Sequence, residues 1–492
     1  MGGSPQAVPV TLTFSSPSPQ FAGLNAQTSR WLELEQTVNE RIFAAPGSVE
    51  IDLGGRTVQS RLHPGRRGIW NQELVWLPSH RARVYGDLGA DANENPLRRD
   101  GCTPLLIHPQ PTAAHRRAAA WYGKATLDGT RATPTASFRS VLAWRGDGDA
   151  MVAKLSLGAK VGGVRRAFIE RDIAAGVMTS AILDTIPALD RQHHRFGWFR
   201  ETGGVIEAES GEGWMLRRLP ALTDDAHLVP LFSLISARGA APPLLVDMIH
   251  ASGLSPETFV VENLVGPYVD VLSYLLFVHG VHFEGHGQNV LFEVDGDGRL
   301  NGRVILRDFS DASVSIPMRV ALERPLPRLR IEASAHREFS SVSAASEHSS
   351  NLHRPLAFRA RDTVERYGLG AFVWSINTSL TRYFRPYDAG SIRRKYLRLW
   401  QSKATRLLGV RPLLRRSPQG LPVDEAIACF LAETDWAALG AGAPVALPAA
   451  AEPLRIFTGV RRRQGRVYHR VHCSWGDVYL EGSRPTFFRP AF

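Results

Sequence analysis

The sequence contains few lysines, although it is strongly basic. Lysine accounts for five of the 58 basic residues and arginine for the others, and the net charge is +11. No basic run is interleaved with aromatic residues, as a groove for a nucleic-acid strand would require. The charge therefore argues against nucleic acid as the main partner. It favours anionic small molecules, because arginine pairs with carboxylates and phosphates through two parallel hydrogen bonds.

Cysteines and long apolar runs are also scarce. Cys102, Cys429 and Cys473 lie far apart and form no CxxC pair and no disulfide framework, which favours a reducing compartment. The N-terminal segment lacks the charged and apolar regions of a signal peptide. No uninterrupted apolar run approaches the length of about 18 residues that a membrane span needs. These absences predict a cytoplasmic protein with no membrane partner.

The length of 492 residues exceeds one ordinary hydrophobic core, so two or three domains are expected. We expect an α+β fold with an N-terminal lobe (1–120), a β-rich region (121–255) and a mostly helical C-terminal region (256–492).

Apolar periodicity predicts the main elements within these regions. Helices are expected at 28–45, 164–186, 257–281, 352–368, 370–384, 391–408 and 423–439. Hairpins are expected from strands 133–144 and 150–161 and from strands 290–294 and 303–309, and the tail 466–482 has a β pattern.

The most informative segment is 282–311, in which a polar turn precedes the second hairpin. Burying so many polar groups between core elements is costly unless they bind a ligand or satisfy one another, and their density favours a ligand. Carboxylate and amide oxygens at this position suit Mg²⁺. The polar side chains in question are Glu284, His286, Gln288 and Asn289, with Asp308 after the hairpin.

Three weaker clusters precede this turn. Ser137 and Arg139 alternate on a predicted strand with Phe138 and Ser140, so that a hydroxyl and a guanidinium share one face and can hold phosphate oxygens. Taken alone, this pattern fits a half-buried strand with an outward arginine better. Lys154, within an apolar strand, points either into a cleft, where it neutralises phosphates, or to solvent.

The third cluster is Arg165-Arg166, just before the apolar helix predicted at 164–186. An arginine at a helix start makes an anion site, although a solvated charge pair fits the pattern equally well. The hydrolase motif GxSxG and the phosphate loop GxxxxGK[ST] are both absent from the sequence.

Together these clusters resemble the NRPS-independent siderophore (NIS) synthetases, the IucA/IucC family of aerobactin synthetases. The family carries Ser-x-Arg-Thr, Lys-Leu, a turn ending in Arg, Glu-x-His-x-Gln-Asn and Arg-Asp-Phe, in this order. The resemblance covers roughly residues 100–410, and Glu-x-His-x-Gln-Asn is its specific part. The matching positions are Ser137–Ser140, Lys154-Leu155, Arg166, Glu284–Asn289 and Arg307–Phe309.

The resemblance implies a cupped-hand architecture of thumb, fingers and palm. A kinase-like nucleotide site would lie between a central sheet and a mostly helical C-terminal lobe. The implied enzyme adenylates a di- or tricarboxylate with ATP and Mg²⁺ and condenses it with an amine or hydroxyl. AMP and pyrophosphate are released, in siderophore or related natural-product biosynthesis. Related enzymes are commonly dimers, so a homodimer is expected.

The resemblance also implies roles for individual residues. The implied catalytic residues are His286, Lys154 and Arg166. ATP would be bound by Ser137, Arg139, Ser140, Lys154, Arg166, His286, Gln288 and Asn289, and Mg²⁺ by Glu284, Asn289 and Asp308. His63, Arg67 and His108 would face the carboxylate, and Lys403 would lie near the substrate.

Three features depart from the family pattern. Gly162 replaces a threonine expected near the phosphates. The His-Pro segments that bind carboxylates survive only at 63–68 and 108–110, and the region before them is shorter than usual. The sequence therefore does not identify the acid.

A kinase-like phosphotransferase is the alternative. Glu284 and Asn289 would form its catalytic loop, and Lys154 would pair with Glu170. Asp308-Phe309-Ser310 would stand where kinases have Asp-Phe-Gly, but no Gly-rich loop precedes Lys154 and the catalytic Asp is missing. A degenerate, non-catalytic nucleotide-binding protein is a further alternative. The three differ in their products: AMP and pyrophosphate, ADP, or neither.

Overall fold

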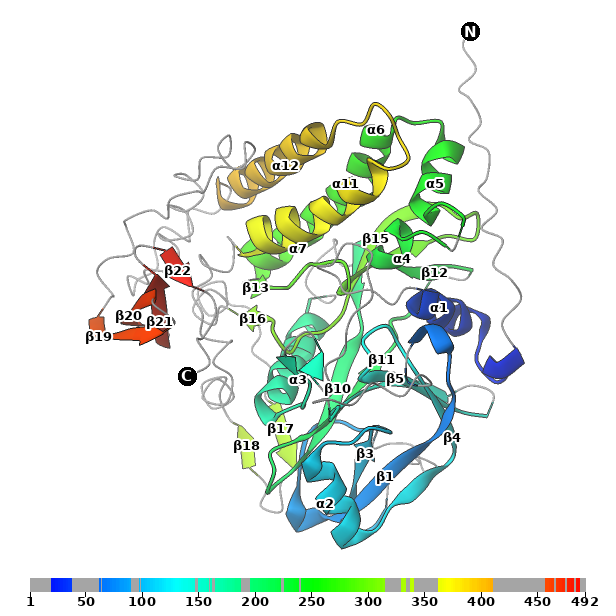
Figure 1. Cartoon of the computed structure of the whole chain (residues 1–492), viewed down its shortest axis with the longest axis vertical. Helices are drawn as coiled ribbons and strands as arrows, with labels where there is room; N and C mark the ends of the chain where they lie inside the picture. The colour runs from blue at the N-terminus through cyan, green and yellow to red at the C-terminus, as the bar shows by residue number, and fades with distance from the viewer. Residues whose placement is uncertain are drawn as a thin grey trace.

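The computed structural model has the mixed α and β composition that the sequence predicts. It describes residues 19–37, 62, 64–89, 97, 99–146, 149–158, 160–161, 164–186, 195–222, 225–238, 240–314, 329–332, 337–339, 362–409, 456–463, 466–473, 476–481 and 484–486. In Figure 1, most strands of a large sheet lie in the lower half, and helices α7, α11 and α12 lie in the upper half.

The large sheet contains ten strands in the order β18-β17-β2-β10-β11-β6-β5-β4-β1-β3. Its strands are β1 (Trp70–Pro78), β2 (Ala82–Gly86), β3 (Cys102–Ile107), β4 (Ala125–Pro134), β5 (Ser140–Arg145), β6 (Asp149–Leu155), β10 (Arg200–Glu207), β11 (Gly213–Arg218), β17 (Leu329–Glu332) and β18 (Arg337–Phe339). Because β1 pairs with β4 and β2 pairs with β10, the sheet crosses the predicted boundary between 1–120 and 121–255. The division into three regions stays a prediction.

A second sheet of four strands carries the predicted second hairpin. Its order is β12 (His227–Pro230), β14 (Val290–Val294), β15 (Leu300–Leu306) and β9 (Phe196–Trp198). The turn between β14 and β15 is closed by the Asp295 carboxylate, which accepts hydrogen bonds from the backbone N–H groups of Asp297 and Arg299. This hairpin fixes the polar turn before β14 and Asp308 after β15 at one end of the sheet.

Several helices surround the two sheets. They are α1 (Ala26–Thr37), α2 (Ala113–Tyr122), α3 (Glu170–Asp184), α4 (Leu231–Ile235), α5 (Leu244–Ser252), α6 (Pro256–Val260), α7 (Gly266–His279), α11 (Trp374–Leu380) and α12 (Ala389–Gly409). π-helical turns occur at η6 (Val261–Val265) and η7 (Asp362–Val373). Short strands pair as β7 (Lys160–Val161) with β8 (Val164–Arg165) and as β13 (Val281–His282) with β16 (Ser313–Val314).

Helix Pro256–His279 (α6, η6 and α7 together) is long and apolar enough to cross a membrane by length and composition. Most of it is buried within the protein instead, at the centre of the largest hydrophobic cluster. Packing against α12 and the second sheet thus accounts for its apolar sequence.

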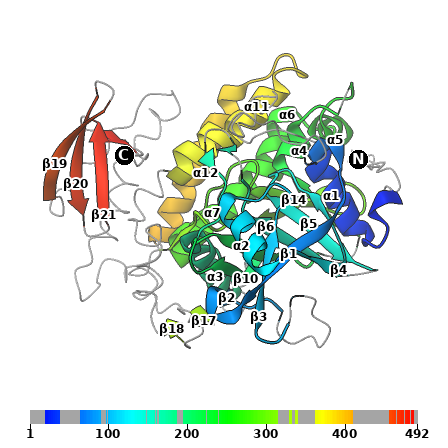
Figure 2. The ribbon, with the colours of Figure 1, turned by 60° about the horizontal axis from the view of Figure 1, so that its bottom comes forward.

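A smaller hydrophobic cluster fills the space between the two sheets. Trp31 of α1, Trp144 of β5, Phe199 and Ile305 of β15 pack together there. Figure 2 shows α1 near β4 and β5, at the side of the large sheet. Helix α1 thus closes one side of the space in which the sheets face each other.

Most predicted elements are present, with shifted boundaries. The helix predicted at 164–186 begins at Glu170 because β8 occupies Val164–Arg165, and the segment 137–140 is a turn that enters β5 only at Ser140. The predicted β-rich tail forms part of an antiparallel sheet of β19 (Ile456–Arg463), β20 (Arg466–Cys473), β21 (Gly476–Glu481) and β22 (Arg484–Thr486). The helix predicted at 423–439 lies outside the described residues.

We predict that Glu35→Ala destabilises the fold strongly. The Glu35 side chain is fully buried on α1 and pairs with Arg307 at 2.5 Å, so its removal leaves a buried guanidinium without this partner. Breaking a buried ion pair in this way costs about 3–5 kcal/mol of unfolding free energy. Chemical denaturation measures the loss.

The matched control is Glu209→Ala. Glu209 pairs with Arg81 at the surface, with half of its side chain exposed, and a surface pair contributes about 0–1 kcal/mol. Equal losses in the two variants would contradict a structural role for the Glu35–Arg307 pair.

Candidate functional site

A row of polar side chains crosses the face of the large sheet that meets the second sheet. Ser140 of β5 lies directly opposite Lys154 of β6, and Val152, two residues before Lys154, lies opposite Arg217 of β11. Arg217 in turn lies opposite Glu201 of β10. Because directly paired residues share a face of a sheet, these groups project together toward the second sheet.

Lys154 joins the two sheets. Its side chain is 2% exposed, and its ammonium group forms an ion pair with the carboxylate of Asp308, two residues after β15. The same ammonium donates to Ser310 Oγ at 3.1 Å. The Lys154 side chain is therefore buried, and the solvent-facing alternative is wrong.

Burial lowers the pKa of Lys154 to about 8. The Asp308 carboxylate opposes this shift, while the positive charges of Arg139 and Arg217 add to it. The ammonium also lies 4.9 Å from the ring centroid of Phe168, an arrangement that favours the charged form. Lys154 is therefore a cation near neutral pH that loses its proton more readily than an ordinary lysine.

Asp308 has a backbone conformation that is rare for a residue with a side chain, with φ of +73°. Its Oδ1 atom pairs with Lys154 and, at 3.0 Å, with Arg217. Burial alone would raise the pKa of this carboxyl, but Lys154, Arg217 and Arg139 outweigh that effect and hold it well below its usual range. Asp308 is thus a fixed negative charge among three cations.

The turn before β5 carries hydroxyl groups that lie near Asp308, in the same pocket. The Ser137 hydroxyl accepts a hydrogen bond from the backbone N–H of Ser140, and Phe138 has φ of +61°. The predicted strand at 137–140 is therefore wrong, because this left-handed residue breaks the alternation. Arg139 donates to the backbone carbonyl of Arg166 at 3.5 Å and lies 5.3 Å over the Phe168 ring. Burial lowers the pKa of Arg139.

The polar turn before β14 is buried and ordered by its own hydrogen bonds. Asn289 Nδ2 donates to the carbonyl of Glu284 at 3.2 Å and lies 3.3 Å from His286 Nε2. Burial lowers the pKa of His286 to about 3, so its imidazole is neutral near pH 7. The Glu284 carboxylate accepts a hydrogen bond from the Tyr367 hydroxyl of η7.

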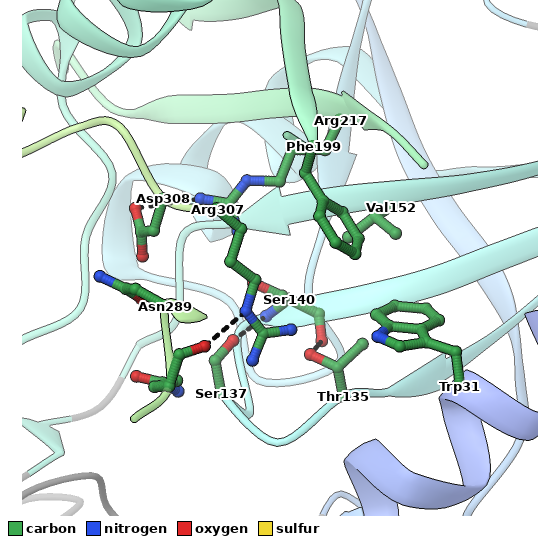
Figure 3. A pocket seen from close by; sticks show the side chains of 11 residues that line it. Trp31, Thr135, Ser137, Ser140, Val152, Phe199, Arg217, Asn289, Arg307 and Asp308 are labelled. Atoms are coloured by element: carbon green, nitrogen blue, oxygen red, sulfur yellow. Dashed lines mark hydrogen bonds and ion pairs between the residues drawn. The ribbon is translucent and has the colours of Figure 1, made fainter. Parts of the chain in front are cut away.

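These elements line one pocket (Figure 3). Figure 3 shows Trp31, Phe199 and Val152 on one side of it and Asn289 and Asp308 on the other. The remaining lining residues are Thr135, Ser137, Ser140, Arg217, Gln288 and Arg307. The pocket thus brings together the turn before β5, the turn before β14 and Asp308. The predicted site residues that line it are Ser137, Ser140, Gln288, Asn289 and Asp308.

Other predicted site residues have different surroundings. His108 is buried and uses both ring nitrogens, because Nδ1 accepts from Gln110 N–H at 3.0 Å and Nε2 lies 3.1 Å from the carbonyl of Phe138. This arrangement does not support the predicted contact of His108 with substrate. The histidine supports the turn that contains Ser137 instead.

Lys403 of α12 pairs with Asp270 of α7 at 2.5 Å, which does not support a role in substrate binding. Arg67 lies in the loop before β1, next to Gly68, whose carbonyl accepts a hydrogen bond from Thr133 just before the turn. His63 and Gly162 lie outside the described residues.

The kinase-like pairing of Lys154 with Glu170 is wrong. The Glu170 carboxylate bonds to Arg83 at 2.8 Å and to the hydroxyl of Tyr85. Lys154 pairs with Asp308 instead.

Sequence reasoning assigned no role to four charged side chains, two that line the pocket and two that lie behind it. Arg217, Arg307, Glu35 and Glu201 are buried in two ion pairs, Glu35–Arg307 and Glu201–Arg217. Two arginines in the apolar strand WMLRRLP were a signal, since an arginine in an otherwise buried strand needs an acidic partner. The two glutamates carried no comparable signal.

Comparisons with known proteins agree with this arrangement. Residues 69–236 match the sequence model of the IucA / IucC family, and residues 261–357 match the one described as ferric iron reductase FhuF-like transporter. The first match includes Ser137 and Lys154, and the second includes Asn289 and Asp308. No curated protein matches the chain.

Residues 69–236 are therefore similar to the IucA/IucC family. Solved structures of NIS synthetases share the fold of this chain, so the predicted resemblance is confirmed. Aerobactin synthetase IucC from Klebsiella pneumoniae is 18% identical with a TM-score of 0.53, over 72% of this chain and 65% of that one. The petrobactin biosynthesis protein AsbB from Bacillus anthracis is 14% identical with a TM-score of 0.52, over 73% and 64%.

ATP-bound aerobactin synthetase IucA from Klebsiella pneumoniae is also similar, at 15% identity with a TM-score of 0.52, over 70% of this chain and 64% of that one. The chain therefore spans just under two thirds of the length of these structures. The α+β class is confirmed, and the cupped-hand arrangement stays a prediction.

We predict that any polyphosphate binding at Lys154 weakens above about pH 8. The Lys154 ammonium, with a pKa of about 8, loses its proton as the pH rises through that value, and the attraction for an anion is lost with it. Affinity for tripolyphosphate should be level between pH 6 and pH 7 and should fall about tenfold per pH unit above 8, because one proton is then taken up on binding. Calorimetry across this range measures it.

The control variant is Lys154→Arg. A guanidinium keeps its charge throughout this range, so the slope above pH 8 should disappear in the variant. An unchanged slope in Lys154→Arg would assign the pH dependence to another group.

Proposed function

We propose that this protein is an ATP-dependent synthetase that activates a carboxylic acid as an acyl-adenylate and joins it to an amine or hydroxyl. The observation that carries the proposal is a pocket lined by Asp308, Gln288 and Asn289, with Lys154 paired to Asp308, within a fold shared with solved siderophore synthetases. ATP binding by the structurally similar IucA supports the choice of nucleotide.

The charges of the site suit a reaction between two anions. A carboxylate and ATP repel each other, so their approach requires fixed positive groups near the phosphates. Lys154 supplies such charge from β6, Arg139 from the turn before β5 and Arg166 from the loop after β8. The hydroxyls of Ser137 and Ser140 add hydrogen bonds. These residues would hold the triphosphate.

The residues of the turn also fit Mg²⁺. Both ion pairs of Asp308 use Oδ1, and Asn289 donates through Nδ2, so one oxygen of each side chain is left for a hard cation. Asp308 and Asn289 would hold the ion. Glu284 is the third proposed ligand, and its carboxylate accepts a hydrogen bond from Tyr367. Among the described residues, no three His, Cys, Asp or Glu side chains are grouped closely enough to hold a metal by themselves. Bound there, Mg²⁺ would neutralise phosphate charge, and substrate oxygens and water would complete its shell.

The proposed chemistry has two steps. An oxygen of the carboxylate attacks the α-phosphorus of ATP, the bond to the β-phosphate breaks, and pyrophosphate leaves. The amine or hydroxyl then attacks the acyl carbon, and AMP leaves with the electron pair of the broken bond. His286, neutral and buried, would donate a hydrogen bond to the α-phosphate as charge gathers on it.

The acid belongs to the di- or tricarboxylate class under this proposal, and the acceptor is an amine or an alcohol. Arg67 remains a proposed carboxylate contact because its loop is hydrogen-bonded to the segment that leads to the turn with Ser137. We further propose a cytoplasmic homodimer that works in siderophore or related natural-product biosynthesis.

Phosphotransfer is the weaker proposal. The pairing of Glu170 with Arg83 and Tyr85 leaves Lys154 without the glutamate that positions the lysine in kinases. A non-catalytic nucleotide-binding protein would use the same pocket without turnover.

The proposal predicts that Lys154→Ala and His286→Ala each abolish carboxylate-dependent pyrophosphate release. Losing a group that stabilises the transition state costs about 10²–10³-fold in rate. The assay uses ATP, Mg²⁺ and hydroxylamine with a panel of di- and tricarboxylates, and it detects AMP, pyrophosphate and hydroxamate.

Lys124→Ala and His80→Ala serve as controls, because both residues are exposed and outside the pocket. Release of ADP in place of AMP would favour phosphotransfer. Undiminished pyrophosphate release by both Lys154→Ala and His286→Ala would overturn the assignment.

A further inference from the structure

A fully buried glutamate, Glu201, lies behind Arg217, one of the residues that line the pocket. Glu201 of β10 has a side chain with 0% exposure, and Arg217 pairs with it at 2.6 Å through NH2 and at 2.8 Å through Nε. Burial raises the pKa of this glutamate, and the charge of Arg217 opposes the shift. A buried ion pair of this kind is weak evidence for stability by itself, so its position invites a functional explanation.

The Glu201 carboxylate has a second contact, to the backbone. The N–H of Phe309 points at both carboxylate oxygens, at 3.3 Å and 3.4 Å. Phe309 directly follows Asp308, whose left-handed backbone conformation is unfavourable for a residue with a side chain. A hydrogen bond from the next residue to a fixed buried carboxylate stabilises that conformation.

Arg217 connects the same carboxylate to the side chain of Asp308. Its NH2 group lies 2.6 Å from Glu201 and 3.0 Å from Asp308 Oδ1. Glu201 therefore acts on Asp308 from two sides, through the backbone of Phe309 and through the guanidinium of Arg217. Both contacts orient the Asp308 carboxylate toward Lys154.

Helix α3 makes room for this glutamate with a glycine. A Cβ atom on Gly176 would lie 2.1 Å from Glu201 Oε2 and 3.0 Å from the sulfur of Met215. Any larger residue at this helical position therefore displaces the carboxylate. Glycine is otherwise unfavourable inside a helix by about 1 kcal/mol relative to alanine, so its presence here needs such a reason.

We propose that Glu201 is a positioning residue that sets the Asp308 carboxylate for metal-bound nucleotide, and that Gly176 serves to admit it. The proposal rests on the nucleotide site proposed above. Glu201 lies outside the pocket and does not touch the ligand, yet its carboxylate determines how well Mg²⁺ and ATP bind together.

The experiment measures ATP affinity by calorimetry with and without Mg²⁺, in wild type, Glu201→Ala, Gly176→Ala and the double variant. The gain in ATP affinity on adding Mg²⁺ should fall about 10–100-fold in Glu201→Ala, as expected when a partner of a metal ligand is lost. Gly176→Ala should show the same loss, because its methyl group displaces the same carboxylate.

The double variant is the decisive measurement. Once Glu201 is alanine, a methyl group at position 176 has no carboxylate to displace, so the double variant should be no worse than Glu201→Ala. Losses that multiply in the double variant would show that the two residues act separately and would overturn the proposal.

Hydrogen exchange at the Phe309 amide gives a reading that needs no nucleotide. Exchange should accelerate in Glu201→Ala and in Gly176→Ala, and Glu201→Gln, which keeps an oxygen acceptor, should retain most of the protection. Absence of ATP binding by the wild-type protein would refute the nucleotide site. An unchanged exchange rate of the Phe309 amide in Glu201→Ala would refute the role of Glu201.

Glu207→Ala controls for the loss of a buried carboxylate on the same strand. Glu207 is 5% exposed, and its carboxylate accepts hydrogen bonds from the backbone N–H groups of Glu209 and Ser210. It should leave both the Mg²⁺ gain and the Phe309 amide unchanged. A loss of the Mg²⁺ gain in Glu207→Ala equal to that in Glu201→Ala would show a general effect of destabilisation and overturn the proposal.

Discussion

The ion pair between Lys154 and Asp308 is the interaction on which the arrangement of the site depends. Lys154 belongs to the large sheet and Asp308 follows the hairpin of the second sheet, so the pair fixes where the two sheets meet. A buried ammonium without a partner costs several kcal/mol, and the pair therefore holds the sheets close at this point. The same pair brings the turn before β5 and the turn before β14 to one pocket.

The Lys154–Asp308 pair also determines the charge that a ligand would encounter in the pocket. Lys154, Arg139 and Arg217 surround one carboxylate, so the site carries excess positive charge in the absence of ligand. A triphosphate would compete with Asp308 for Lys154, and a divalent cation would offset the negative charge that both then share. Glu201 holds Arg217, and Arg217 holds the Asp308 carboxylate in place if Lys154 moves toward a phosphate. The buried ion pairs therefore influence ligand binding in the pocket.

The sequence predicted the strands of the site better than its turns and buried charges. The alternation of apolar and polar residues predicted β5, β6 and the β14–β15 hairpin. The density of polar residues at 284–289 predicted one side of the pocket. The turn at 137–139 was missed because the left-handed conformation of Phe138 leaves no signature in a non-glycine residue. Glu35 and Glu201 look like ordinary surface glutamates in the sequence, since their arginine partners lie 272 and 16 residues away. The His-Pro motif suggested that His108 contacts the substrate. Its ring nitrogens are instead used in two hydrogen bonds, to Gln110 and Phe138, which the sequence could not show.

The most direct test of the account is a crystal structure with Mg²⁺ and an ATP analogue whose α,β-bridge cannot be cleaved. The account predicts triphosphate density between Lys154 on one side and Asn289 and Asp308 on the other, with Mg²⁺ against the two oxygen ligands. Nucleotide bound elsewhere, with Lys154 still paired to Asp308 and no density between the two sheets, would contradict it.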